Sequence, residues 1–84
     1  MSTTVFKKPN KKQITNAKNH FAQAVRNRRH SLDMSQQQLA KLAGVDRKTI
    51  NRIENGHFSP NLDTIVRLLS VLNLAPAKLI KLNG

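Results

Sequence analysis

Apolar residues recur at helical spacing along most of the 84-residue chain, and no stretch shows the alternation of a half-buried strand. A first helix is predicted from Thr15 or Asn16, with one apolar face made by Ala17, Phe21 and Val25, and Ala24 beside them. Asp33 follows its last turn, where a residue in the left-handed conformation commonly ends a helix and Gly is the usual choice. The pattern predicts an all-α fold.

Two short helices are predicted next, joined by a tight turn. Ser35 and Gln38 have the spacing of a capping box and begin a helix that ends at Gly44. Its apolar residues are Leu39, Ala40, Leu42 and Ala43. Asp46 is placed as the N-cap of the next helix, which runs from Arg47 to Asn55. Two short helices connected this tightly are typical of a helix-turn-helix.

In the C-terminal part of the chain, the apolar pattern and the capping residues predict two more helices. Asn61 caps one over residues 62–72, with an inward face of Leu62, Ile65, Leu68, Leu69 and Leu72. Asn73 ends it, and Pro76 opens a last short helix through Leu82. Residues 14–84 therefore form one five-helix domain. Residues 1–13 are Lys-rich and too poor in apolar residues to fold alone, so they form a flexible basic arm. This arm either follows DNA phosphates or is a solvated tail.

The composition points to a polyanionic partner. Fifteen Lys and Arg against four Asp and Glu give a formal net charge of +11, which favours nucleic acid. The chain has no Cys, no apolar run of membrane-spanning length and no secretory signal pattern, so we expect a cytoplasmic, nucleoid-associated protein without a membrane partner. The three His lack metal-ligand spacing, and no catalytic constellation is present. We expect neither a cofactor nor a metal nor enzyme activity.

The third predicted helix has two chemically different faces. At 100° per residue, Ile50 and Ile53 fall together and face the core. The opposite side carries cations and amides and no acid: Arg47 at its edge, Lys48, Asn51, Arg52 and Asn55. An ordinary solvated face usually mixes charge signs to gain favourable pairs, whereas these side chains suit base edges in the major groove. Glu54 falls on the inner side and needs a buried cation, for which Arg29 is the best candidate.

These residues together resemble the phage-repressor and Cro-like helix-turn-helix family, the XRE-type transcriptional regulators. The resemblance rests on Ser35–Ala40, Ala43–Val45, Thr49–Gly56 and Pro60, and extends over about Phe21 to Leu82. It implies a compact five-helix lambda-repressor-like domain whose third helix enters the major groove of double-stranded DNA. The chain departs from the family pattern at Asp33, where Gly is common, and at Ala75, where a better N-cap is usual.

The resemblance also implies roles for individual residues. Base contacts are assigned to Arg47, Lys48, Asn51 and Arg52, and Thr49 and Asn51 match positions that touch base or backbone. Phosphate contacts are assigned to Gln36, Thr49, Asn55, His57 and Ser59. Arg29 and Glu54 match a structural ion pair of the family, in agreement with the helix wheel. Family members usually pair about a two-fold axis, and the candidate dimer surface is apolar: Val71, Leu74, Pro76, Leu79, Ile80 and Leu82. The alternative is that most of these residues cap the core of the monomer.

The sequence thus predicts a DNA-binding transcriptional regulator, a repressor or autoregulator that binds a palindromic operator as a homodimer. One alternative is an antitoxin that neutralises a partner toxin and also autoregulates its operon. Only the basic arm could wrap such a partner, and it has little apolar content for a protein interface. The other alternative is an architectural protein that coats DNA without sequence preference. With no sensor domain in evidence, we expect regulation through concentration, a partner or degradation.

Overall fold

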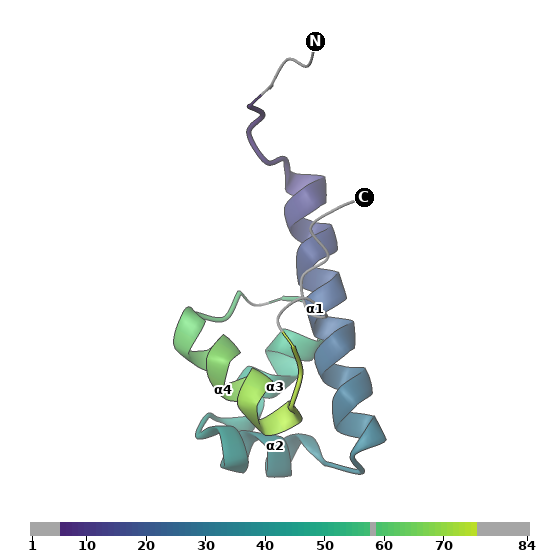
Figure 1. Cartoon of the computed structure of the whole chain (residues 1–84), viewed down its shortest axis with the longest axis vertical. Coiled ribbons are helices and arrows are strands. Elements are labelled where there is room, and N and C mark those ends of the chain that lie inside the picture. Colours follow the sequence, from purple (N-terminus) through teal and green to yellow (C-terminus); the bar gives the residue numbers. More distant parts are fainter. Residues whose placement is uncertain (1–5, 58, 76–84) are drawn as a thin grey trace.

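The computed structural model describes residues 6–57 and 59–75, and within them the chain forms four helices and no strand. They are α1 (Lys11–Ser31), α2 (Gln36–Ala43), α3 (Arg47–Glu54) and α4 (Leu62–Leu72). The predicted all-α class is confirmed, but with four helices instead of five. The fifth helix, predicted from Pro76 to Leu82, lies outside the described residues. Helices α2, α3 and α4 gather beside the C-terminal half of α1 (Figure 1).

Helix α1 begins earlier than the apolar pattern predicts. Asn10 caps it in a capping box with Gln13: the Asn10 side chain accepts from the Gln13 amide at 2.8 Å, and the Gln13 side chain accepts from the Asn10 amide at 3.0 Å. Residues 11–13 of the predicted arm are therefore helical. The N-terminal half of α1 extends beyond the other helices (Figure 1), so Ala17 is exposed and its prediction as a core residue is wrong. Ala22, which the apolar pattern missed, is buried.

The core is small and lies where the four helices meet. Its buried members are Val25, Leu39, Ala40, Ala43, Ile50, Ile53, Leu68 and Leu72, and Phe21, Met34 and Val45 pack against them in part. Two predicted core residues are wrong: Leu42 and Leu62 are 64% and 72% exposed. Leu42 lies to one side of the buried Leu39–Ala40–Ala43 face of α2, next to Leu39 on the helix wheel. Leu62 is the first residue of α4, before that helix reaches the core.

Left-handed residues end the helices where the sequence indicated. Asp33 follows α1 with φ 52°, Gly44 ends α2 with φ 71°, and Asn73 ends α4 with φ 51°. At Gly44 space matters as well, because a Cβ there would lie 2.8 Å from Nη1 of Arg67. The capping box of Ser35 and Gln38 is confirmed, with the Gln38 amide donating to the Ser35 hydroxyl at 3.0 Å. These local signals fix the tight turn between α2 and α3.

Part of the positive charge holds the fold together. Among the described residues, three arginines donate to carbonyls at helix C-termini, which lack partners inside their own helix. Arg26 donates to the Glu54 carbonyl of α3, Arg28 to the Leu72 carbonyl of α4 at 2.8 Å, and Arg67 to the Ala43 carbonyl of α2 at 3.3 Å. These three guanidinium groups keep their charge, but the donors that hold the carbonyls are not available to a polyanionic partner.

Candidate nucleic-acid interface

Helix α3 is held by its inner face and offers its outer face to solvent. Ile50 and Ile53 are fully buried, as the helix wheel predicts. Asp46 is the N-cap residue with extended backbone, as predicted, although its side chain makes no capping hydrogen bond. The helix ends at Glu54, one residue before the predicted end, and Asn55 is its C-cap. Burial of the two isoleucines sets the direction in which the outer residues point.

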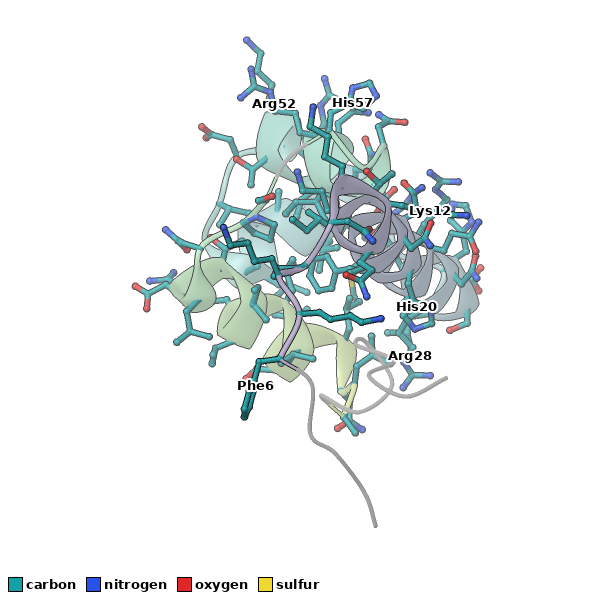
Figure 2. All side chains as sticks on the ribbon, turned by 90° about the horizontal axis from the view of Figure 1, so that it is seen from above. Phe6, Lys12, His20, Arg28, Arg52 and His57 are labelled. Atoms are coloured by element: carbon teal, nitrogen blue, oxygen red, sulfur yellow. The ribbon has the colours of Figure 1, made fainter. Side chains whose placement is uncertain are left out.

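The outer face of α3 carries free positive charge. The side chains of Arg47, Lys48 and Arg52 are exposed and make no hydrogen bond or ion pair with any described residue. Asn51 and Asn55 are exposed beside them, and Thr49 is half-buried at the edge of the face. The Arg52 side chain points away from the body of the protein, on the same side as His57 (Figure 2). Such an arrangement of donors can reach phosphates and the guanine acceptors of a major groove.

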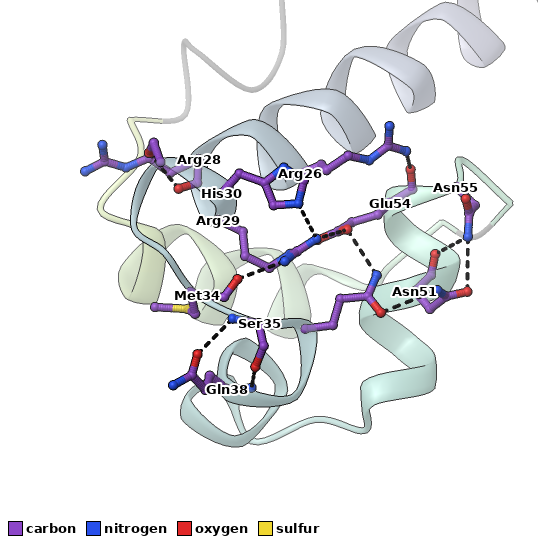
Figure 3. Close-up of polar contacts among 12 residues, drawn as sticks. Arg26, Arg28, Arg29, His30, Met34, Ser35, Gln38, Asn51, Glu54 and Asn55 are labelled. Atoms are coloured by element: carbon purple, nitrogen blue, oxygen red, sulfur yellow. Dashed lines mark hydrogen bonds and ion pairs between the residues drawn. The ribbon is translucent and has the colours of Figure 1, made fainter.

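The predicted ion pair between α1 and α3 is present and buried. Arg29 Nε and Nη2 donate to Glu54 Oε2 and Oε1 at 2.6 and 2.9 Å, and the side chains are 9% and 3% exposed (Figure 3). Arg29 Nη1 also donates to the carbonyl of Met34 at 2.8 Å. The hydrogen bonds to Glu54 raise the pKa of Arg29 above its ordinary value, and their effect exceeds the opposing effect of burial. Arg29 is therefore charged at neutral pH.

The side chain of Gln36, a predicted phosphate contact, is hydrogen-bonded to two other side chains of the protein. Its Nε2 donates to Glu54 Oε1 at 3.1 Å, and its Oε1 accepts from Asn51 Nδ2 at 3.4 Å. Asn55 Nδ2 donates to Asn51 Oδ1 at 3.0 Å. The structure thus joins Gln36, Asn51 and Asn55 to the buried pair, which sequence reasoning missed. The one-turn spacing of Asn51 and Asn55 is a visible signal for their contact, but the Gln36 contact depends on how α2 crosses α3.

The loop after α3 extends this side of the molecule. His57 and Ser59, both predicted phosphate contacts, are exposed. The side chain of Asn19 from α1 lies against Gly56, since a Cβ at Gly56 would come within 2.8 Å of its Oδ1. The middle of α1 therefore supports the start of the loop. His57 lies near Arg52 in the view from above (Figure 2).

The predicted dimer residues are only partly visible. Val71 and Leu74 are half-buried and pack against the core, which agrees with the alternative that they cap the monomer. Pro76, Leu79, Ile80 and Leu82 lie outside the described residues. On the outer side of α4, Leu62 and Val66 are exposed one turn apart. The described residues thus leave the dimer surface a prediction.

Nowhere in the described part of the chain do three His, Cys, Asp or Glu side chains gather as they would to hold a metal ion. None of the described helices combines the length and apolar character that a membrane crossing requires.

The fold and the outer face of α3 together define a DNA-binding helix-turn-helix protein. The helix-turn-helix family HTH_3 matches residues 25–79, and the chain belongs to this family. Its members are transcriptional regulators and not enzymes. A curated relative, an uncharacterised HTH-type transcriptional regulator of Haemophilus influenzae, is 46% identical over 44 residues. The match covers 52% of this chain and 45% of that relative, so the chain spans about half the length of the curated relative it matches.

Solved structures share the fold. The restriction-modification controller protein C.AhdI of Aeromonas hydrophila is 31% identical with a TM-score of 0.72, covering 77% of this chain and 98% of its own. An HTH_3 family transcriptional regulator of Vibrio cholerae is 27% identical with a TM-score of 0.72, covering 79% of this chain and 37% of its own. A hypothetical transcription factor of Neisseria is 23% identical with a TM-score of 0.73 over 93% of this chain and 86% of its own, a likeness of fold alone.

Proposed function

We propose that this protein is a cytoplasmic, sequence-specific repressor or autoregulator that binds a palindromic operator as a homodimer, with α3 in the major groove. The observation that carries the proposal is the outer face of α3, where Arg47, Lys48 and Arg52 are exposed without partners. Three unpaired cations on one short helix repel one another, and a polyanion relieves that repulsion. The likeness to a restriction-modification controller, at 31% identity over nearly that protein's whole length, supports a regulatory role.

The residues divide into base and phosphate contacts. Arg47, Lys48, Asn51 and Arg52 read base edges, because Arg and Lys donate to guanine and Asn pairs with adenine. Phosphate contacts come from the rim of the face: Gln36, Thr49, Asn55, His57 and Ser59. Phosphate contacts hold the protein in position and carry no sequence information themselves. The dimer uses the apolar C-terminal segment, in which Val71 and Leu74 could contribute only the surface that the core leaves uncovered.

The assignment of α3 is tested by removing its cations. Arg47→Ala and Arg52→Ala should each weaken binding to the preferred duplex by about 1–3 kcal/mol and relax the preference at one base pair. Lys41→Ala is the matched control, because it also removes one exposed cation. Lys41 is on α2 beside Leu32 and Asp33 and does not belong to the outer face of α3. Selection of duplexes from a random pool supplies the preferred site, and titration at fixed salt gives the affinities. Unchanged affinity in both arginine variants would refute the assignment.

The same selection tests symmetry. A homodimer with one α3 in each half-site predicts two inverted half-sites about 34–36 Å apart, one turn of the duplex. Sedimentation at increasing protein concentration measures dimerisation independently of DNA. Recovery of a single, non-repeated half-site from the pool would contradict the dimer.

A further inference from the structure

Three amide side chains connect the buried ion pair to the outer face of α3. We call Gln36, Asn51 and Asn55 the amide relay. Asn55 Nδ2 donates to Asn51 Oδ1 at 3.0 Å, Asn51 Nδ2 donates to Gln36 Oε1 at 3.4 Å, and Gln36 Nε2 donates to Glu54 Oε1 at 3.1 Å. The contacts of Asn51 and Asn55 are drawn in Figure 3. All these hydrogen bonds run in one direction, toward the carboxylate of Glu54.

The direction is fixed at both ends of the relay. At one end the ionised Glu54 can only accept, so Gln36 must turn Nε2 toward it and Oε1 toward Asn51. At the other end the main-chain carbonyl of Asn51 can also only accept, and Asn55 Nδ2 donates to it at 2.9 Å. Asn51 lies between these ends. If the Asn51 amide were turned by half a turn, its Oδ1 would face the acceptor Oε1 of Gln36. Its Nδ2 would then face the donor Nδ2 of Asn55.

An asparagine amide with one orientation reads purines differently from one that can turn. Adenine offers N7 as acceptor and N6 as donor, whereas guanine offers two acceptors, N7 and O6. Within the relay Asn51 keeps one free N–H on Nδ2 and one free lone pair on Oδ1, the pair of groups that adenine needs. The fixed Oδ1 would face O6 of guanine and repel it. An amide free to turn could direct Nδ2 at guanine instead.

We propose that the amide relay, anchored on Glu54, fixes the orientation of Asn51 so that the protein selects adenine over guanine at one base pair of its target. Gln36 and Asn55 are then positioning residues for a base contact. This inference rests on the proposed function, because it requires α3 to lie in a major groove. It also gives the Arg29–Glu54 pair a second role, since the pair holds the carboxylate on which the relay ends.

Gln36→Met tests the relay without disturbing the ion pair. Methionine has a similar length and shape but cannot donate or accept as the amide does, and Arg29 still holds Glu54. The readout is the ratio of affinities for two duplexes that differ only by adenine or guanine at the base pair whose preference Asn51→Ala relaxes. Since the variant removes one hydrogen bond to Asn51, we expect this ratio to fall about three- to tenfold. Asn55→Ala removes the contact on the other side and should lower the same ratio.

Three controls separate the orientation of Asn51 from stability and from phosphate binding. The preference at the base pair read by Arg47 should stay unchanged in Gln36→Met. In an Asn51→Ala background, Gln36→Met should leave the adenine-to-guanine ratio unaltered, because the residue that it orients is gone. Thermal melting shows whether each variant is folded at the assay temperature, and Asn55→Ala provides the test if Gln36→Met is not.

Other outcomes overturn the inference. If Gln36→Met weakens both duplexes equally, Gln36 is a phosphate contact alone and the relay does not set specificity. If Asn51→Ala relaxes no base pair, or one where adenine is not preferred, the inference also fails. In each of these cases the affinities of Arg47→Ala and Arg52→Ala still test the proposed function independently. If the wild-type protein binds all duplexes equally, the proposed function itself fails.

Discussion

The buried pair of Arg29 and Glu54 is the interaction whose removal should most damage the fold. Its two charge-assisted hydrogen bonds, at 2.6 and 2.9 Å, join α1 to α3 where both side chains are more than nine-tenths buried. Glu54→Leu would leave the Arg29 guanidinium buried with its bond to the Met34 carbonyl and its contact with His30. Arg29→Met would leave the Glu54 carboxylate with Gln36. Each single variant therefore buries an unbalanced charge.

The expected loss in the free energy of unfolding is large compared with the total stability of so small a domain. Removing one partner of a buried pair typically costs ~3–5 kcal/mol. At the usual ~0.05–0.15 kcal/mol per residue, this 84-residue chain has ~4–13 kcal/mol in total. For a domain of this size each kcal/mol corresponds to about 4–8 °C in Tm, so each single variant should melt more than about 10 °C below the wild type. The double variant, which buries no charge, should be more stable than either single one.

Urea denaturation of the four proteins, followed by circular dichroism, measures this cycle. Asp63→Asn is the matched control, since it neutralises an exposed carboxylate on α4 and should change the free energy of unfolding little. If Glu54→Leu and Arg29→Met each lie within ~1 kcal/mol of the wild type, the pair is effectively solvated. If the losses of the two single variants add in the double variant, the two charges do not compensate each other. Either result would refute the reasoning.

Further variants test three other parts of the structure. Gly44→Ala should lower the free energy of unfolding by ~1–2 kcal/mol because of its positive φ, whereas the contact of its Cβ with the flexible end of Arg67 should add little; urea denaturation in the wild-type and Arg67→Met backgrounds should therefore give the same loss. Asn10→Ala should reduce stability by ~0.5–2 kcal/mol and increase amide exchange in the first turn of α1 while leaving α3 protected. If the exposed start of α1 follows DNA phosphates, Lys11→Gln and Lys12→Gln should each lower the slope of log affinity against log salt by ~0.9; unchanged slopes would indicate a solvated segment.

The apolar pattern predicted helices well where they touch the core and poorly where they do not. The start of α1 was missed because residues 11–16 carry no regular apolar face; the Asn10 capping box, which depends on polar residues, sets that start. Leu42 and Leu62 were wrongly placed in the core because hydrophobicity alone does not tell which side of a short helix is covered. Eight residues in α2 make little more than two turns, too few for the pattern to exclude a second apolar side.

The sequence by itself determined the two faces of α3, the breaks at Asp33, Gly44 and Asn73, and the need for a cation beside Glu54. These features depend on residues within about one helical turn of each other, or on the cost of burying a charge, and both can be read along the chain. Only the tertiary structure decided that Gln36 reaches Asn51 and that arginines of one helix cap the carbonyls of another. Such contacts depend on how the helices cross, and that is set by the packing of the whole core at once.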